Sequence, residues 1–134
     1  MNGPTVARVL VVEDDEMIRD VITSNLIRAG HQVLEAGSGN EAIVAVTERD
    51  TNPELAVLDI GLPDIDGFEL VGALRQLPDL TDLPVIFLSG RVGGDDVAAG
   101  RALGCTYLTK PFIASALLGA IDRNLSPAVR ASTW

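Results

Sequence analysis

The chain has 134 residues, which fits a single domain, and its 47% hydrophobic and 22% charged residues are typical of a folded globular protein. Its 19 acidic and 10 basic residues give a net charge of -9 at pH 7, and this negative charge disfavours direct binding to nucleic acid. The single cysteine excludes an internal disulfide, and the lack of a secretory signal or of an apolar stretch of roughly 18 residues predicts a cytoplasmic protein without membrane insertion.

Five short apolar runs predict five strands, because they recur at fairly even intervals along the chain. In chain order they are Val9–Val12, Val33–Leu34, Leu55–Leu58, Val85–Leu88 and Tyr107–Leu108. The first, third and fourth runs are apolar throughout and rich in Val and Ile, which is typical of strands covered on both faces.

Between the runs, apolar residues recur three or four positions apart, which predicts helices with one buried face. The three clearest sets are Ile18, Ile22, Leu26 and Ala29; Leu70, Leu74 and Leu77; and Leu117, Ile121 and Leu125. Ser38–Glu41 matches a capping box, and Asp66 is a predicted N-cap. Gly30 and Gly104 occupy predicted C-cap positions. The stretch Gly93–Arg101 has few large apolar residues, so it is either a short surface helix or an element of low stability that moves.

Strands and helices that alternate five times predict an α/β domain, a parallel sheet with helices on both faces. We place this domain at residues 8–125, between an N-terminal tail at 1–7 and a C-terminal tail at 126–134. Ligands of such sheets bind beyond the carboxyl ends of the strands. The residues directly after each apolar run are therefore the candidates for a functional site.

Acids, a hydroxyl and an amine follow four of the predicted strands: Glu13, Asp14, Asp59, Ser89 and Lys110. If the first and third strands are neighbours, the carboxylates of Asp14 and Asp59 lie close together. Two such charges about 4 Å apart repel by roughly 4 kcal/mol at an effective dielectric of about 20. A divalent cation offsets this repulsion, and a site made only of oxygen ligands suits Mg²⁺. The only lysine of the chain, Lys110, adds a compact positive charge.

Acids, a metal, a hydroxyl and a lysine around one carboxylate suit phosphoryl transfer, which requires mostly positioning and charge neutralisation. Asp59 is the candidate nucleophile, because carboxylates form aspartyl phosphates. Lys110 would hold the phosphoryl oxygens together with the metal, and Ser89 would donate a hydrogen bond to one of them.

The same residues resemble the receiver domain of two-component response regulators, from about Ala7 to Leu125. Four motifs carry this resemblance in the expected order: Val11–Asp15, Leu58–Gly67, Leu88–Gly90 and Tyr107–Phe112. The resemblance implies a (βα)5 flavodoxin-like fold with the strand order 2-1-3-4-5. It also implies that a histidine kinase or a histidine phosphotransfer protein passes a phosphoryl group to Asp59.

The resemblance further implies a role for each site residue. The ligands of Mg²⁺, or of Mn²⁺ in its place, would be Asp59, Asp14, Glu13 mostly through water, and the backbone carbonyl of Gly61. Ser89 and Tyr107 would form the switch that responds to phosphorylation. The Lys110–Pro111 peptide bond would be cis, as is typical of the family.

Some of these residues also have plainer interpretations. Glu13–Asp15 suits the cap of a helix, and Tyr107 suits a half-buried core position. We expect His31, just past a helix, at the surface and Cys105 in the core. Three residues that rim the predicted site are expected to contact the phosphodonor: Met17, Ile18 and Phe112.

These patterns predict a stand-alone receiver that switches protein–protein interactions in a phosphorelay through an unidentified downstream protein. Its catalysis would be limited to its own phosphorylation and dephosphorylation. A receiver excised from a larger DNA-binding regulator or hybrid kinase is the first alternative. A haloacid-dehalogenase-like aspartyl phosphatase is disfavoured, because Gly61 stands where that family requires an acid/base Asp. Homodimer formation through the fourth helix, fifth strand and fifth helix is left open.

Overall fold

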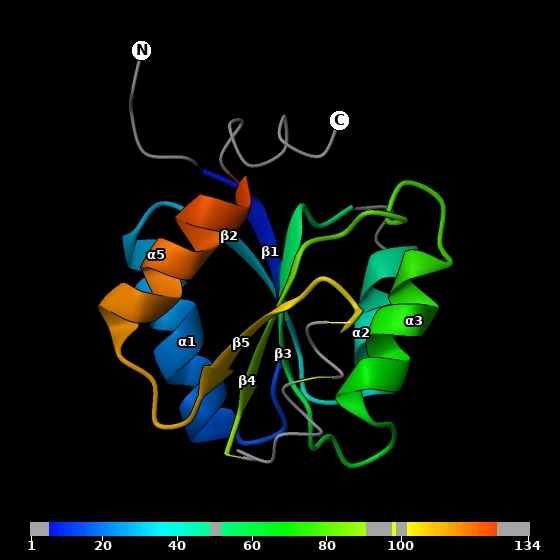
Figure 1. The fold of residues 1–134 in the computed structure, drawn as a ribbon, viewed down its shortest axis with the longest axis horizontal. Helices are drawn as coiled ribbons and strands as arrows, with labels where there is room; N and C mark the ends of the chain where they lie inside the picture. The colour runs from blue at the N-terminus through cyan, green and yellow to red at the C-terminus, as the bar shows by residue number, and fades with distance from the viewer. Residues whose placement is uncertain (1–5, 49–51, 91–97, 99–101, 126–134) are drawn as a thin grey trace.

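A computed structural model of the chain describes residues 6–48, 52–90, 98 and 102–125. Its elements in chain order are β1 (Arg8–Val12), α1 (Glu16–Arg28), β2 (Gln32–Ala36), α2 (Gly39–Glu48), β3 (Leu55–Asp59), α3 (Gly67–Arg75), β4 (Val85–Ser89), β5 (Thr106–Thr109) and α5 (Ala114–Leu125). The five strands form one parallel sheet in the order β2-β1-β3-β4-β5, with α1 and α5 on one face and α2 and α3 on the other (Figure 1). The predicted fold class and strand order are confirmed. The predicted fourth helix, Gly93–Arg101, lies outside the described residues except for Ala98.

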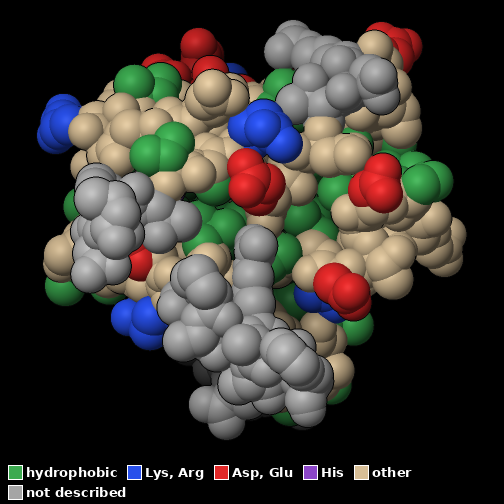
Figure 2. All heavy atoms as spheres, turned by 90° about the horizontal axis from the view of Figure 1, so that it is seen from above, with side chains coloured by type: hydrophobic (Ala, Val, Ile, Leu, Met, Phe, Trp, Pro, Cys, Tyr) green, Lys and Arg blue, Asp and Glu red, His purple; other side chains and the backbone are tan. Residues whose placement is uncertain are grey.

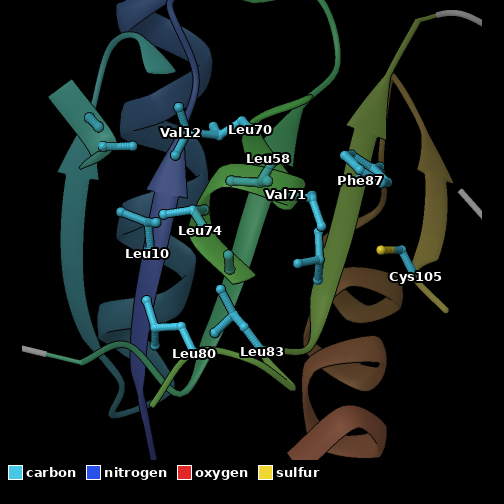
Figure 3. Close-up of a cluster of buried hydrophobic side chains, with 14 of the residues drawn as sticks. Leu10, Val12, Leu58, Leu70, Val71, Leu74, Leu80, Leu83, Phe87 and Cys105 are labelled. Atoms are coloured by element: carbon cyan, nitrogen blue, oxygen red, sulfur yellow. The ribbon is translucent and has the colours of Figure 1, made fainter. Parts of the chain in front are cut away.

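Each face of the sheet is covered by its own hydrophobic cluster. On one face, Leu10 of β1 and Phe87 of β4 pack with Leu74 of α3 (Figure 3). On the other face, Ile22 of α1 and Ile121 of α5 pack against the sheet. All residues of β3 and β4 are buried, as expected for strands covered on both sides. Within the described parts of the chain, no helix combines the length and apolar character needed to cross a membrane.

Two of the helices begin at polar residues that the sequence marks as caps. The Asp66 carboxylate accepts a backbone N–H of α3 at 2.9 Å, and the Ser38 hydroxyl accepts the Glu41 N–H at 3.1 Å. The Glu41 carboxylate accepts the N–H of Gly37 at 2.5 Å, so the reciprocal bond of the predicted capping box forms one residue earlier. After α1, Gly30 has a φ of 96°, a left-handed conformation that favours glycine.

The structure contradicts the prediction that His31 lies at the surface, because only 5% of this residue is exposed. Its Nδ1 accepts the N–H of Ala7 at 3.1 Å, and the N–H of Gln32 donates to the Ala7 carbonyl at 3.0 Å. These bonds join the start of β1 to the start of β2, and the His31 ring is buried at this junction. Ala7 itself is also buried. Cys105 is buried as predicted, and burial raises the pKa of its thiol.

Candidate functional site

The predicted site residues lie at one edge of the sheet, where the carboxyl ends of the strands meet. Glu13 and Asp14 follow β1, Asp59 ends β3, Ser89 ends β4 and Lys110 follows β5. The strands are parallel and in register, with Asp59 opposite Leu88 and Ser89 opposite Thr109. The sheet alone therefore brings together side chains that are far apart in the sequence.

The opposite end of the sheet, where β1 and β3 begin, is shown in Figure 2. Acidic and basic side chains are interspersed on this face rather than gathered by sign. At the amino ends of β1 and β3, for example, Arg8 and Glu54 form an ion pair of 3.9 Å. The charged side chains visible at this end therefore form no cluster of a single sign.

Three carboxylates form a compact cluster at the carboxyl edge. Glu13, Asp14 and Asp59 each offer an oxygen, and these atoms all lie within 4.8 Å of one another. Glu13 is 2% exposed and Asp59 is 9% exposed, whereas Asp14 is open to solvent. The cluster therefore has a buried floor and one accessible side. An oxygen-only set with access to water fits Mg²⁺ or Mn²⁺.

Lys110 is the cation of this cluster. Its Nζ donates to Glu13 Oε1 at 2.5 Å and to Asp59 Oδ2 at 3.3 Å. Burial, and to a lesser degree the Asp59 charge, raise the pKa of Glu13 despite its contacts with Lys110 and the Asp15 N–H. Burial is the largest single influence on Lys110 and lowers its pKa, but the bonds and charges of Glu13 and Asp59 together raise it. The pKa values of both groups are therefore raised, and a divalent cation bound beside them would lower both.

Backbone groups fix the directions of the two buried acids. Asp59 Oδ1 accepts the N–H of Gly61 at 3.2 Å, and Glu13 Oε2 accepts the N–H of Asp15 at 3.1 Å. Arg19, which sequence reasoning missed, donates from Nη1 to the Glu13 carbonyl at 2.8 Å. No local pattern predicts this bond, because it depends on how α1 packs against the end of β1.

The two predicted switch residues differ in burial. Ser89 is 2% exposed, and its carbonyl accepts the N–H of Lys110 at 2.8 Å. Tyr107 lies opposite Phe87 in the sheet and packs, half-buried, against the same hydrophobic cluster. The Lys110–Pro111 peptide bond is cis, as the resemblance implies. The responses of Ser89 and Tyr107 to phosphorylation stay predictions.

The three residues expected to rim the site are not equally accessible. Met17 is 80% exposed at the start of α1. Ile18 and Phe112 are instead partly buried and pack against the hydrophobic cluster under α1 and α5. Ile113, which sequence reasoning missed, is 71% exposed and stands three residues after Lys110.

A family model described as the response regulator receiver domain matches residues 9–122. The chain belongs to the receiver domain family of response regulators. Among its relatives, the transcriptional regulatory protein PrrA of Mycobacterium tuberculosis is 39% identical over 124 residues, which cover 92% of this chain and 52% of PrrA. Protein PilG of Pseudomonas aeruginosa is 36% identical over 119 residues, which cover 88% of this receiver and 87% of PilG. The receiver thus spans about half the length of PrrA and most of PilG.

Solved structures of receivers share the fold. The chemotaxis protein CheY4 of Vibrio cholerae is 30% identical with a TM-score of 0.82, over 90% of this receiver and 100% of CheY4. The receiver domain of the hybrid histidine kinase CckA is 31% identical with a TM-score of 0.73, over 89% of this receiver and 99% of that domain. Receiver domains in general use Mg²⁺ and interact with histidine kinases or phosphotransfer proteins.

Proposed function

We propose that Asp59 accepts a phosphoryl group from a phosphohistidine of a histidine kinase or histidine phosphotransfer protein, in a reaction that depends on Mg²⁺. The proposal rests on one observation, the convergence of three carboxylates and the Lys110 ammonium at the carboxyl ends of the strands. Membership of the receiver family supports the same assignment.

In this transfer the P–N bond of the phosphohistidine breaks and a P–O bond forms to a carboxylate oxygen of Asp59. The electron pair of the broken bond stays on the imidazole nitrogen, which takes up a proton. Lys110 contacts the phosphoryl oxygens, and Ser89 donates a hydrogen bond to one of them. The ammonium of Lys110 lies 3.3 Å from Asp59 Oδ2, so its positive charge is already beside the acceptor.

The metal ligands in this proposal are Glu13, Asp14, Asp59 and the backbone carbonyl of Gly61. When bound, the ion supplies positive charge that neutralises the phosphoryl oxygens. Glu13 and Asp59 are buried and held by backbone N–H groups, which keeps their oxygens aimed at one point. Asp14 is exposed, so water and the phosphoryl group reach the cluster from the side of Asp14.

The phosphodonor in this proposal docks over the start of α1 and the segment after Lys110. Met17 and Ile113 expose apolar side chains there, on the two segments that flank the acidic cluster. Phosphorylation then acts through Ser89 and Tyr107 on a downstream protein in the cytoplasm. In this proposal the folded domain comprises residues 8–125 together with Ala7, which is bonded to His31 and Gln32.

Two contexts for this switch are favoured by different relatives. The match to most of PilG favours a stand-alone receiver. The match to about half of PrrA favours a receiver that is one part of a longer transcriptional regulator. Both contexts use the same acceptor chemistry at Asp59.

Intact-protein mass spectrometry tests the proposal directly. With a small phosphodonor such as acetyl phosphate and Mg²⁺, we expect the wild type to gain one phosphoryl group and the Asp59→Asn variant to gain none. Asp82→Asn is the matched control, because Asp82 is an exposed acid before β4, at the other end of the sheet. Removing Mg²⁺ with a chelator should prevent the labelling. Equal labelling of wild type and Asp59→Asn would show that the acceptor is wrongly assigned.

A further inference from the structure

The loop between β3 and α3, residues 60–66, is bonded to the first turn of α2. Both carboxylate oxygens of Asp64 take part: Oδ1 accepts the N–H of Gly39 at 2.9 Å, and Oδ2 accepts the N–H of Asn40 at 2.8 Å. These bonds join segments 24 and 25 residues apart, so they depend on the tertiary fold. The N–H donors of Asn40 and Gly39 lower the pKa of Asp64, which therefore stays ionised at neutral pH.

A close apolar contact accompanies these hydrogen bonds. A Cβ atom added to Gly39 would lie 2.0 Å from Cγ2 of Ile65, much less than a van der Waals contact. Glycine at position 39 therefore lets the loop lie directly against α2. The helix already has a cap of its own, because the Ser38 hydroxyl accepts the N–H of Glu41.

The base of the same loop is closed next to the acceptor. Asp59 Oδ1 accepts the N–H of Gly61, and Gly61 forms an isolated antiparallel bridge with Asp66. The N–H of Gly67 donates to the Ile60 carbonyl at 2.8 Å. The loop is thus held at its base by its own backbone and at its tip by α2. Gly61 lies in this loop between Asp59 and the tip, three residues before Asp64.

We propose that Asp64 is a positioning residue, which ties the β3–α3 loop to α2 and so fixes the Gly61 carbonyl relative to the Asp59 carboxylate. Gly39 contributes to the same contact, because it donates its N–H to Asp64 and leaves room for Ile65. The inference rests on the proposed function, because that function makes the Gly61 carbonyl a metal ligand. The β2–α2 loop and α2 carry no ligand in that proposal, yet they determine where one of the ligands lies.

The first test measures Mg²⁺ binding to the full chain by calorimetric titration. We expect Asp64→Ala to raise the Mg²⁺ dissociation constant roughly tenfold, the lower end of the effect of removing groups that orient metal ligands. Asp64→Asn, which keeps one acceptor oxygen, should lie between Asp64→Ala and the wild type. Asp82→Ala removes the same charge at the other end of the sheet and should bind Mg²⁺ as the wild type does. A wild-type dissociation constant in Asp64→Ala would overturn the inference.

A second variant disturbs the contact between α2 and the β3–α3 loop without changing the charge of the chain. Gly39→Ala should weaken Mg²⁺ binding because its methyl group pushes Ile65 away. The double variant Gly39→Ala/Ile65→Ala should restore binding, because it removes the methyl group that Gly39→Ala meets. A merely structural contribution of Gly39 to α2 predicts lost stability without this rescue, and that result would overturn the inference.

Amide hydrogen exchange provides a readout that needs neither metal nor phosphorylation. The Gly61 amide should exchange faster in Asp64→Ala than in Asp82→Ala, and equal rates would overturn the inference.

Acetyl phosphate labelling separates the inference about Asp64 from the proposed function. If the wild type is labelled at Asp59 while Asp64→Ala keeps wild-type Mg²⁺ binding, only the inference is wrong. If the wild type is not labelled at Asp59, the proposed function is wrong, and the role of Asp64 at that site is wrong as well.

Discussion

The centre and the edge of the sheet are built differently. Every residue of β3 and β4 is buried, whereas Thr106–Leu108 of β5 are half-buried and Thr109 is exposed. The central strands carry the candidate acceptor Asp59, and the edge strand leads to Lys110. Asp59 thus ends a strand whose residues are all buried, whereas Lys110 follows a strand whose residues are only half-buried or exposed. Two residues of the candidate site, Asp59 and Lys110, are therefore held by strands that differ in burial.

A matched pair of leucines gives the strongest test of the difference between the central strands and β5. Leu88 of β4 and Leu108 of β5 are opposite each other in the sheet and contact the same hydrophobic cluster, but Leu88 is 1% exposed and Leu108 is half-buried. We expect Leu88→Ala to lower the free energy of unfolding by about 3–5 kcal/mol and Leu108→Ala by about 2 kcal/mol. Urea denaturation measures both, and equal losses would show that the edge is packed as firmly as the centre.

A smaller effect is expected at the contact between α5 and β5. Asn124 Nδ2 donates to Thr106 Oγ1 at 3.2 Å and to the Ala120 carbonyl at 2.7 Å. Asn124→Ala should cost about 1 kcal/mol of unfolding free energy and speed amide exchange in β5 without changing β4. The control is Asn25→Ala, because Asn25 Nδ2 donates to Val21 within its own helix. Identical exchange profiles for the two variants would mean that Asn124 does not stabilise β5.

The smallest effect concerns the exposed carboxylate of Asp64, which holds the loop after the central strand β3. Its pKa is lowered from 3.8 in the folded state by the N–H groups of Asn40 and Gly39. The stability it contributes is therefore present above pH 3.8 and is lost as the pH falls through the folded-state pKa. Asp64→Asn imitates the protonated acid, so its unfolding free energy should lie below that of the wild type at neutral pH and converge with it in acid. A constant offset between the two curves would contradict this assignment.

Much of the fold follows from local patterns. The wholly apolar runs at Leu55–Leu58 and Val85–Leu88 predicted the buried central strands, because only strands covered on both faces need apolar residues at every position. The caps at Ser38 and Asp66 were predicted because a short polar side chain next to an apolar helix face satisfies free N–H groups. The proximity of Asp14 and Asp59 required only the strand order in addition.

Contacts between distant segments were not predictable in this way. His31 was expected at the surface, yet its ring is covered by a bond to Ala7 that forms only once β1 and β2 are aligned. The contacts of Arg19 with the Glu13 carbonyl and of Asp64 with the Gly39 N–H carry no local signal either, because backbone groups are the same in every sequence. The acids of the candidate site were therefore visible in the sequence, and the contacts of Arg19 and Asp64 with backbone groups were not.

The chain contains one lysine, and that lysine is part of the acidic cluster. Any reagent or enzyme that acylates lysine side chains thus has a single ε-amine to modify, between Glu13 and Asp59. Acylation would turn this ammonium into a neutral amide and remove the cluster's own cation. Amine-selective chemistry marks most proteins at many scattered lysines, but here a modified lysine would report on whether the Lys110 ammonium alone is accessible or occupied.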